Sequence, residues 1–296
     1  MVLTLIWGSN FIVVKWALDE VTPLAFNALR FPVGCLVLWM AARWLGPLPR
    51  PRLRDLPALA ALALLGNVVY QIFFIYGLDW TRAGNAALLL STIPVWALLL
   101  AALVREGTLH RSVWMGVALT LVGMVVMVGG GTQALGIEGT SLRGDLLMVL
   151  AAMSWAGYTV GARPLVLRYG TVPVTAWTLW GGSVVLVAVG LPDVMATDLR
   201  ALSLGAWGAV LFAGAFALGV AYLIWYRAVR RMGSARTAAF SNLIPVVALL
   251  LAWVVLGEAL AWLQLLGAGI ILAGIVLVRW GATGVAGFAI WRTGRD

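Results

Sequence analysis

Long apolar stretches alternate with short polar ones along the whole chain. Charges, prolines and glycines separate ten apolar segments, at residues 1–18, 23–45, 56–78, 82–104, 111–130, 143–163, 171–191, 203–226, 234–256 and 260–280. Each segment is near the ~20 residues that cross a bilayer as a helix. Lipid offers no partner to backbone polar groups, and the alternation of a membrane β-barrel is absent. The pattern predicts an all-α polytopic membrane protein with ten transmembrane helices.

Composition agrees with this class and removes others. The 296 residues are 63% hydrophobic and 10% charged, whereas soluble proteins are about 45–50% apolar and about 25% charged. The net charge of +9 is spread thinly between apolar runs, so we expect no nucleic-acid partner. Cys35 and His110 are the single cysteine and the single histidine. They cannot form a conventional zinc site, and no metal or cofactor is expected.

The basic residues are distributed unevenly between the two sets of alternate loops. Fifteen lie in the loops and C-terminal tail of one side, and three, Arg82, Arg143 and Arg200, lie on the other. Such a bias predicts that the basic side faces the cytoplasm. We therefore expect a multi-pass protein of a bacterial-type inner membrane with both termini in the cytoplasm.

One stretch occurs twice. Residues 76–95 read YGLDWTRAGNAALLLSTIPV, and residues 226–246 read YRAVRRMGSARTAAFSNLIPV. Segments one to five and six to ten therefore form two repeats, residues 1–136 and 137–296. Because each contains an odd number of helices, the second is predicted to be inverted relative to the first, around a central cavity. Other landmarks recur in order: Pro23 with Pro173, and Gly116 and Gly123 with Gly267 and Gly274.

Four motifs carry a family resemblance: W-G-S-N-F in the first segment, N-A-A-L-L-L-S-T-I-P-V in the fourth, T-A-A-F-S-N-L-I-P-V in the ninth and L-G-E-A-L before the tenth. They resemble the EamA-type ten-helix members of the drug/metabolite transporter superfamily, and within it the YddG-type aromatic amino acid exporters. The resemblance implies a secondary transporter that exports amino acids or other small metabolites. The first repeat departs from the pattern, with Arg105-Glu106-Gly107 where the second has Leu256-Gly257-Glu258.

Polar and aromatic residues in the middle of the segments are the candidate site. In the third segment Asn67, Tyr70, Gln71 and Phe74 share one helix face. Such a face avoids lipid, so it either lines a cavity or forms hydrogen bonds between helices. The predicted substrate-binding residues are Trp7, Asn10, Asn67, Tyr70, Gln71, Phe74, Ser91, Trp96, Trp155, Tyr158, Trp177, Trp180, Ser241 and Asn242.

Seven further tryptophans lie near segment ends and predict an aromatic belt at the membrane surfaces. They are Trp16, Trp44, Trp80, Trp207, Trp225, Trp262 and Trp280.

Prolines and charges within the segments suggest moving parts. Pro94 and Pro245 each remove a helix hydrogen bond, so they are predicted hinges, with a static kink as the alternative. Lys15, Arg30 and Asp79 are predicted gate residues, and the functional interpretation of Lys15 and Arg30 includes binding of a carboxylate. The alternative for Lys15 and Arg30 is that each side chain extends towards the outer membrane surface, Arg30 in the direction of Asp19 or Glu20.

The sequence favours transport over catalysis. No Walker A, His-Glu-x-x-His or Gly-x-Ser-x-Gly motif occurs, so no enzyme is expected. The hypothesis is a transporter of neutral or aromatic amino acids that works by alternating access in the lipid bilayer. No Asp or Glu lies in the middle of a segment, which favours uniport over proton coupling. A multidrug or nucleotide-sugar carrier and a non-transport scaffold are the alternatives. The chain is expected to act as a monomer, with a dimer left open.

Overall fold

A computed structural model describes residues 2–46, 48–81, 86, 89–106, 110–129, 142–244, 246–247 and 261–290, and these contain no β-strand. The α-helices are α1 (Val2–Ala17), α2 (Pro23–Leu45), α3 (Leu56–Leu64), α4 (Tyr70–Trp80), α6 (Ile93–Leu103), α7 (Arg111–Gly129), α8 (Leu142–Tyr169), α9 (Thr171–Ala196), α10 (Leu204–Phe212), α11 (Ala221–Met232), α12 (Ser234–Ala239) and α14 (Trp262–Ile290). The prediction of an all-helical, multi-pass chain is confirmed.

Two long rods are each interrupted by a π-helical segment. One helix, Leu53–Trp80, covers the predicted third segment, and we call it the third span; it joins α3 and α4 through Leu65–Val69. The other, Leu204–Met232, covers the predicted eighth segment, and we call it the eighth span; it joins α10 and α11 through Ala213–Val220. A π-helical turn is rare and often marks a functional site. Both π-helical segments therefore mark the middle of these spans as a candidate functional site.

The helices differ in their capacity to cross a bilayer. Five are long and apolar enough by themselves, and four shorter apolar helices also occur among the described residues. The long ones are Pro23–Trp44, Leu53–Trp80, Leu142–Tyr169, Thr171–Ala196 and Leu204–Met232. The short ones are Val2–Ala17, Ile93–Leu103, Arg111–Met127 and Trp262–Val278.

The predicted fourth segment, 82–104, is not one continuous helix. The chain turns at Ser91 and Thr92, and α6 begins at Ile93. Pro94 thus lies in the first turn of a helix, where proline removes no hydrogen bond that the helix needs. In the second copy α12 gives way to a 3₁₀ turn at Phe240–Asn242. Pro245 lies outside the described residues.

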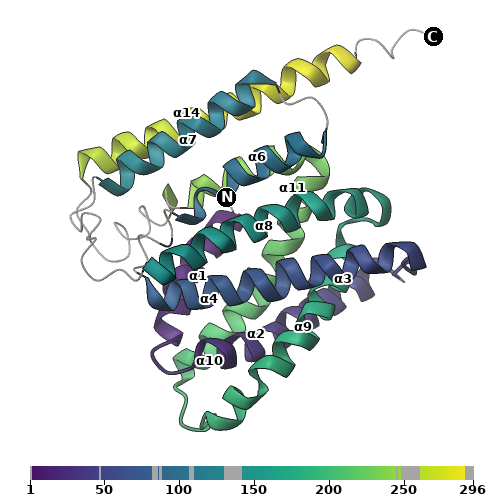
Figure 1. Cartoon of the computed structure of the whole chain (residues 1–296), viewed down its shortest axis with the longest axis vertical. Helices are drawn as coiled ribbons and strands as arrows, with labels where there is room; N and C mark the ends of the chain where they lie inside the picture. The colour runs from purple at the N-terminus through teal and green to yellow at the C-terminus, as the bar shows by residue number, and fades with distance from the viewer. Residues whose placement is uncertain are drawn as a thin grey trace.

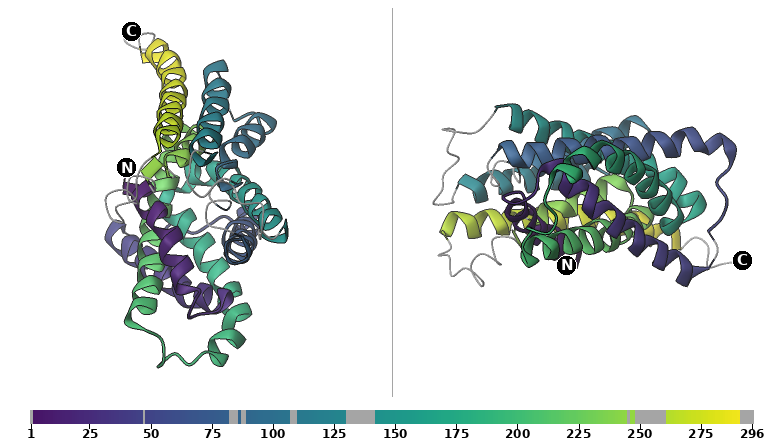
Figure 2. Two further views of the ribbon diagram at one scale, coloured as in Figure 1. Left: turned by 90° about the vertical axis from the view of Figure 1, so that its left-hand side faces the viewer. Right: turned by 90° about the horizontal axis from the view of Figure 1, so that it is seen from below.

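Helices far apart in sequence pack side by side (Figures 1 and 2). α7 lies along α14 and α2 along α9. A Cβ atom on Gly116 would lie 2.7 Å from the carbonyl oxygen of Gly274, and one on Gly123 would lie 2.8 Å from that of Gly267. Small residues let the two backbones approach this closely. The pairing of low numbers in α7 with high numbers in α14 shows that these helices are antiparallel.

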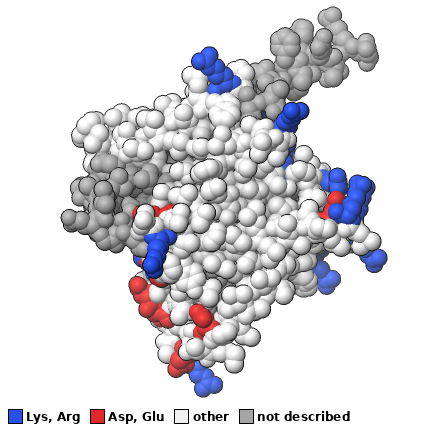
Figure 3. Space-filling model, in the orientation of Figure 1, with Lys and Arg blue, Asp and Glu red and all other residues white. Residues whose placement is uncertain are grey.

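Charge is concentrated at the two ends of the helical bundle (Figure 3). Red atoms gather at the lower left of the view, near the α1–α2 and α9–α10 connections, and most blue atoms lie towards the right and top. The acidic end includes Glu20, Asp193 and Asp198, and the basic end includes Arg43, Arg50 and Arg168. On the face seen in Figure 3, the described surface between the ends carries almost no charge, as a bilayer requires.

Candidate functional site

Five aromatic side chains meet where α1, α4, α8 and α11 come together. We call Trp7, Tyr70, Trp155, Tyr222 and Trp225 the ring cluster. The Trp155 ring lies at its centre, with its centroid 4.8 Å from Tyr70 and 5.1 Å from Tyr222. Trp7 and Trp225 complete the cluster, 5.6 Å and 5.8 Å from Trp155. The Trp7–Trp155 pair is edge-to-face and the other three pairs are tilted, and all four lie within the range of about 4.5–7 Å for interacting aromatic rings.

The π-helical segments contact two of the helices around the ring cluster, α1 and α8. The Trp7 Nε1 group donates a 3.1 Å hydrogen bond to the carbonyl of Ala217 in the π-helical segment of the eighth span. On the other side, the Tyr158 ring packs against Gly66 in the π-helical segment of the third span. Gly66 has no side chain, and a Cβ atom there would overlap that ring. α1 and α8 therefore each contact a π-helical segment.

A buried cation lies beside the ring cluster. Arg30 is 2% exposed, and its Nε donates to Asn27 Oδ1 at 2.9 Å. One terminal amino group donates to Gln71 Oε1 at 2.7 Å, and Gln71 Nε2 donates in turn to the Tyr222 hydroxyl at 3.0 Å. The guanidinium also lies 5.1 Å from the centre of the Phe26 ring. A continuous polar path thus connects α2 to the cluster.

Asn67, predicted to share the face of Gln71, forms contacts with the second half of the chain. Its Nδ2 donates to the Thr178 carbonyl at 3.2 Å, and the hydroxyls of Thr178 and Tyr158 lie 2.7 Å apart. Its Oδ1 and that of Asn10 are buried, with no hydrogen-bond donor in the described part of the chain.

The structure brings the remaining predicted binding residues only partly into this site. Phe74 stacks on Tyr70, 5.8 Å away, and so extends the cluster along α4. Asn242 instead donates to Thr120 of α7 at 2.9 Å, and Ser241 bonds to the Ala238 carbonyl of its own helix.

Ser91 and the tryptophans of α6 and α9 have other surroundings. Ser91 is buried at the helix break, where Trp96 donates to Thr92 at 3.2 Å. Trp177 contacts Tyr169. Trp180 donates to the Cys35 carbonyl at 3.2 Å and lines a cavity at the basic end with Trp39 and Arg43.

Two residues at the heart of the site were not singled out by the sequence. Tyr222 was not considered, and Trp225 was assigned to the membrane-surface belt. That assignment is wrong, because α11 continues to Met232 and Trp225 is completely buried. The spacing of Tyr222, Trp225 and Tyr226 places all three on one helix face, which is the signal that could have identified them.

The predicted gate residues lie at different depths. Lys15 donates to the carbonyls of Leu78 and Asp79 at 3.0 and 3.3 Å, so its charge caps the C-terminal end of α4. The interpretation that Arg30 extends to the outer surface is wrong, because its side chain points into the protein interior.

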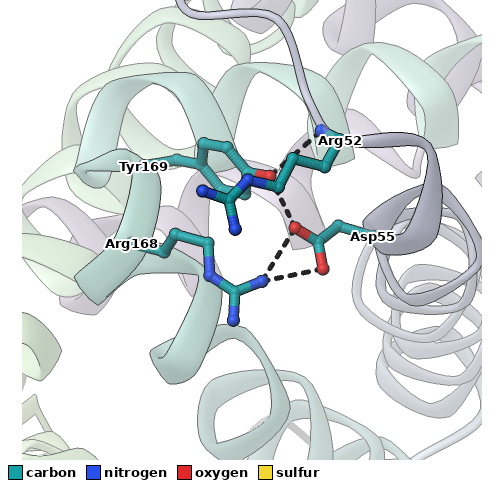
Figure 4. A network of polar contacts seen from close by, with 4 residues as sticks. All are labelled: Arg52, Asp55, Arg168 and Tyr169. Atoms are coloured by element: carbon teal, nitrogen blue, oxygen red, sulfur yellow. Dashed lines mark hydrogen bonds and ion pairs between the residues drawn. The ribbon is translucent and has the colours of Figure 1, made fainter.

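Contacts between the two halves of the chain occur at both ends. At the basic end Arg168 and Tyr169 bind Asp55, at 2.8 and 2.5 Å, and the Arg52 backbone donates to the same tyrosine (Figure 4). Arg163 and the Ser234 backbone also bind Glu106 there, at 3.2 and 2.6 Å.

At the acidic end the contacts are hydrogen bonds to carboxylates. Thr22 donates to Asp193 at 2.9 Å and Thr81 to Asp145 at 2.6 Å. Glu20 accepts from the backbone and hydroxyl of Ser203, and these bonds lower the pKa of the Glu20 carboxyl.

Known proteins are similar to this chain in fold and in sequence. A crystal structure superposes with a TM-score of 0.80 over 96% of each chain at 21% identity, which shows a shared fold. A protein of Streptantibioticus cattleyicolor named a probable terminal-alkyne amino-acid exporter is 31% identical over 94% of this chain and 92% of its own. A protein of Salmonella typhimurium named a probable amino-acid metabolite efflux pump is 27% identical over 100% and 96%.

The pattern of the EamA-like transporter family matches residues 1–129 and again residues 142–280. These matches cover nearly all the described helices, including every residue of the ring cluster. The chain belongs to the EamA-like transporter family and is a multi-pass membrane transporter.

Proposed function

We propose that this protein exports small metabolites, foremost neutral and aromatic amino acids, from the cytoplasm. The observation that carries the proposal is the ring cluster, which is largely buried at the crossing of four helices and is linked through Gln71 to the buried Arg30 cation. The side-chain oxygens of Asn10 and Asn67 are also buried, with no donor among the described residues. Aromatic walls with a few polar groups suit a flat, zwitterionic solute. The amino-acid cargo printed in the names of two relatives supports the same class.

The proposed mechanism is alternating access between two inverted five-helix repeats, residues 1–136 and 137–296. Three observations support it: the π-helical segments in the third and eighth spans, the antiparallel pairing of α7 with α14, and end contacts that join the halves. Opening the basic end requires the Asp55 and Glu106 contacts to break, while opening the acidic end requires the Thr22 and Thr81 bonds to break. The central site then faces each side in turn.

Flux through purified protein in liposomes tests the proposal. We expect labelled phenylalanine and threonine to enter faster than a cationic dye. A dye that enters while amino acids do not would favour a multidrug carrier, and no flux of any solute would overturn transport by this chain alone. An imposed pH gradient should leave the phenylalanine rate unchanged if the protein is a uniporter, whereas concentrative uptake driven by the gradient would show proton coupling.

Selectivity should depend on the ring cluster. Tyr70→Ala removes one wall next to Trp155, so we expect phenylalanine to lose its preference over threonine in the same liposomes. Trp16→Ala is the matched control, because Trp16 is half exposed on the outer surface of α1. An unchanged phenylalanine-to-threonine ratio in Tyr70→Ala would argue against substrate binding at the cluster.

Orientation has its own test. In a Cys35→Ser background, a cysteine introduced by Arg50→Cys lies at the basic end and one introduced by Asp198→Cys lies at the acidic end. If the basic end faces the cytoplasm, an impermeant maleimide added to intact cells should label only the second. The opposite pattern would reverse the proposed direction.

A further inference from the structure

Arg30 is a charge in an unusual place. It lies seven residues into α2, about 10 Å from the start of the helix, and its side chain is 2% exposed. Arginine within a membrane span usually extends to the surface or pairs with an acid. The side chain of Arg30 is buried instead, and it has no acidic partner in the part of the chain that the structure describes.

Among the described residues, all the groups that Arg30 contacts are neutral. It donates to the amide oxygens of Asn27 and Gln71 and lies against the Phe26 ring. Both ion pairs found among the described residues use other arginines, Arg163 and Arg168. A buried guanidinium without an anion is strongly unfavourable. The site is therefore electrostatically incomplete until an anion arrives.

The surroundings indicate which anion fits. A guanidinium has five N–H donors, and the hydrogen bonds to Asn27 and Gln71 use two. The planar arrangement of the others matches the two oxygens of a carboxylate. Through Gln71 the cation is one residue away from Tyr222, whose ring belongs to the ring cluster. A carboxylate on Arg30 would thus place the rest of a small molecule beside aromatic rings.

We propose that Arg30 binds the carboxylate of the transported solute, while the ring cluster receives its side chain. The proposal rests on the amino-acid transport proposed above and narrows it, because the carboxylate becomes a requirement and the ammonium does not. Gln71 is the positioning residue, since it holds the guanidinium and ties it to Tyr222.

Unlabelled analogues tested on the unaltered protein give the first experiment. In liposomes that take up labelled phenylalanine, 3-phenylpropionate keeps the carboxylate and lacks the ammonium, whereas phenylalaninamide keeps the ammonium and lacks the carboxylate. We expect phenylpropionate to compete at least about tenfold better than phenylalaninamide, a factor that corresponds to loss of a charged contact. Equal competition, or stronger competition by the amide, would overturn the proposal.

Variants of the anchor give the second experiment. Arg30→Gln should raise the half-saturation concentration for phenylalanine at least about tenfold, and Arg30→Lys should restore part of the loss because it keeps the charge without the planar fork. Arg43→Gln is the matched control, because Arg43 is also on α2 and lies over a ring, that of Trp39, but at the basic end. Unchanged saturation in Arg30→Gln would contradict the proposal.

Gln71→Glu separates anchoring from a purely structural role. It keeps the shape of Gln71 and places a carboxylate beside Arg30, so the cation gains a resident partner. We expect the melting temperature to stay the same or rise while phenylalanine transport falls at least about tenfold. This variant keeps the test valid if Arg30→Gln does not fold. Full transport by Gln71→Glu would overturn the anchor.

Failure of the two proposals would look different. If the unaltered protein carries phenylalanine but treats phenylalaninamide equally, only the anchor is wrong. If it moves no amino acid, the proposed function fails and the anchor fails with it.

Discussion

The third and eighth spans share a backbone plan and differ in chemistry. Each is a long rod with a π-helical segment near its middle. The third span places amides there, Asn67 and Gln71, which bond to other helices. The eighth span has an apolar π-helical segment, AGAFALGV, and contributes the rings of Tyr222 and Trp225 just after it. The third span thus supplies amide groups that form hydrogen bonds, and the eighth span supplies aromatic rings.

The same asymmetry appears in α2 and α9. Arg30 lies seven residues after Pro23, and Trp180 lies seven residues after Pro173. Arg30 is buried against Gln71, whereas Trp180 bonds to the Cys35 carbonyl and borders the cavity at the basic end. Helices at corresponding positions, such as α2 and α9, can therefore present different chemistry to the two sides of one site. The proposed transport of an asymmetric solute such as an amino acid requires such a difference.

Removal of the central amide should be the most damaging change to either rod. Gln71→Leu deletes the acceptor for Arg30 and leaves the buried cation with fewer partners. We expect a loss of about 3 kcal/mol of unfolding free energy, measured by denaturation in mild detergent. Leu218→Ala, at a buried apolar position of the eighth span, compares this with an ordinary core truncation. If the unfolding free energy of Gln71→Leu equals that of the unaltered protein, the amide of Gln71 does not contribute to the stability of the third span.

Overpacking at the π-helical segment of the third span should cause the second-largest loss of stability. Gly66→Ala introduces a Cβ into the Tyr158 ring, and overpacking of this kind costs about 1–3 kcal/mol. Gly208→Ala, in the eighth span with open space around it, should be neutral or stabilising by up to about 1 kcal/mol. Equal melting temperatures for the two variants would mean that the Tyr158 ring or the third span moves enough to accommodate the added methyl group.

The ring side should tolerate loss of its polar atom better than the amide side does. Tyr222→Phe keeps the ring within the cluster and removes the hydroxyl that accepts from Gln71. We expect a loss of about 1 kcal/mol in the same denaturation assay. If Tyr222→Phe loses as much unfolding free energy as Gln71→Leu, then the Tyr222 hydroxyl holds Arg30 and Gln71 in place as strongly as the amide does. The third and eighth spans would then differ less in chemistry than proposed.

The basic ends of the two spans should differ slightly. Asp55→Asn weakens the contact with Arg168 at the start of the third span, but the arginine side chain is 42% exposed, so we expect only a small fall in the melting temperature. Arg231→Gln, at the exposed end of the eighth span, should change nothing measurable. A larger effect of Arg231→Gln would reverse the expected order.

The acidic start of the eighth span should show a small pH dependence. Hydrogen bonds from Ser203 lower the pKa of Glu20 below its ordinary value of 4.5. A lowered carboxyl pKa contributes stability above the ordinary value, and that stability disappears as the pH falls through the lowered value. The melting temperature of Glu20→Gln should therefore lie slightly below that of the unaltered protein above pH 4.5 and converge with it at lower pH. A constant difference at all pH values would exclude this titration.

Much of the architecture follows from the sequence because the bilayer imposes a simple rule. Apolar runs of about twenty residues must be helices, and the boundaries predicted for 23–45 and 171–191 lie close to α2 and α9. The break at Ser91 was not predicted, since a local apolar pattern does not show where a helix stops bonding internally. Asn67 and Gln71 are buried, as the sequence predicts for a polar face that avoids lipid. That this face, with Tyr70 and Phe74, lines a substrate cavity stays a prediction.

The partners of that face were decided by tertiary structure. Tyr222 lies 151 residues from Gln71, and their hydrogen bond depends on how two rods cross. Trp225 has the same residue type as the lipid-facing Trp44, and only packing determines that one is buried and the other 92% exposed. The sequence alone thus determined that the chain is helical, spans a membrane and carries polar groups within it. The fold decided that Arg30 faces inward without an acid, because burial and pairing are properties of neighbours that are distant along the chain.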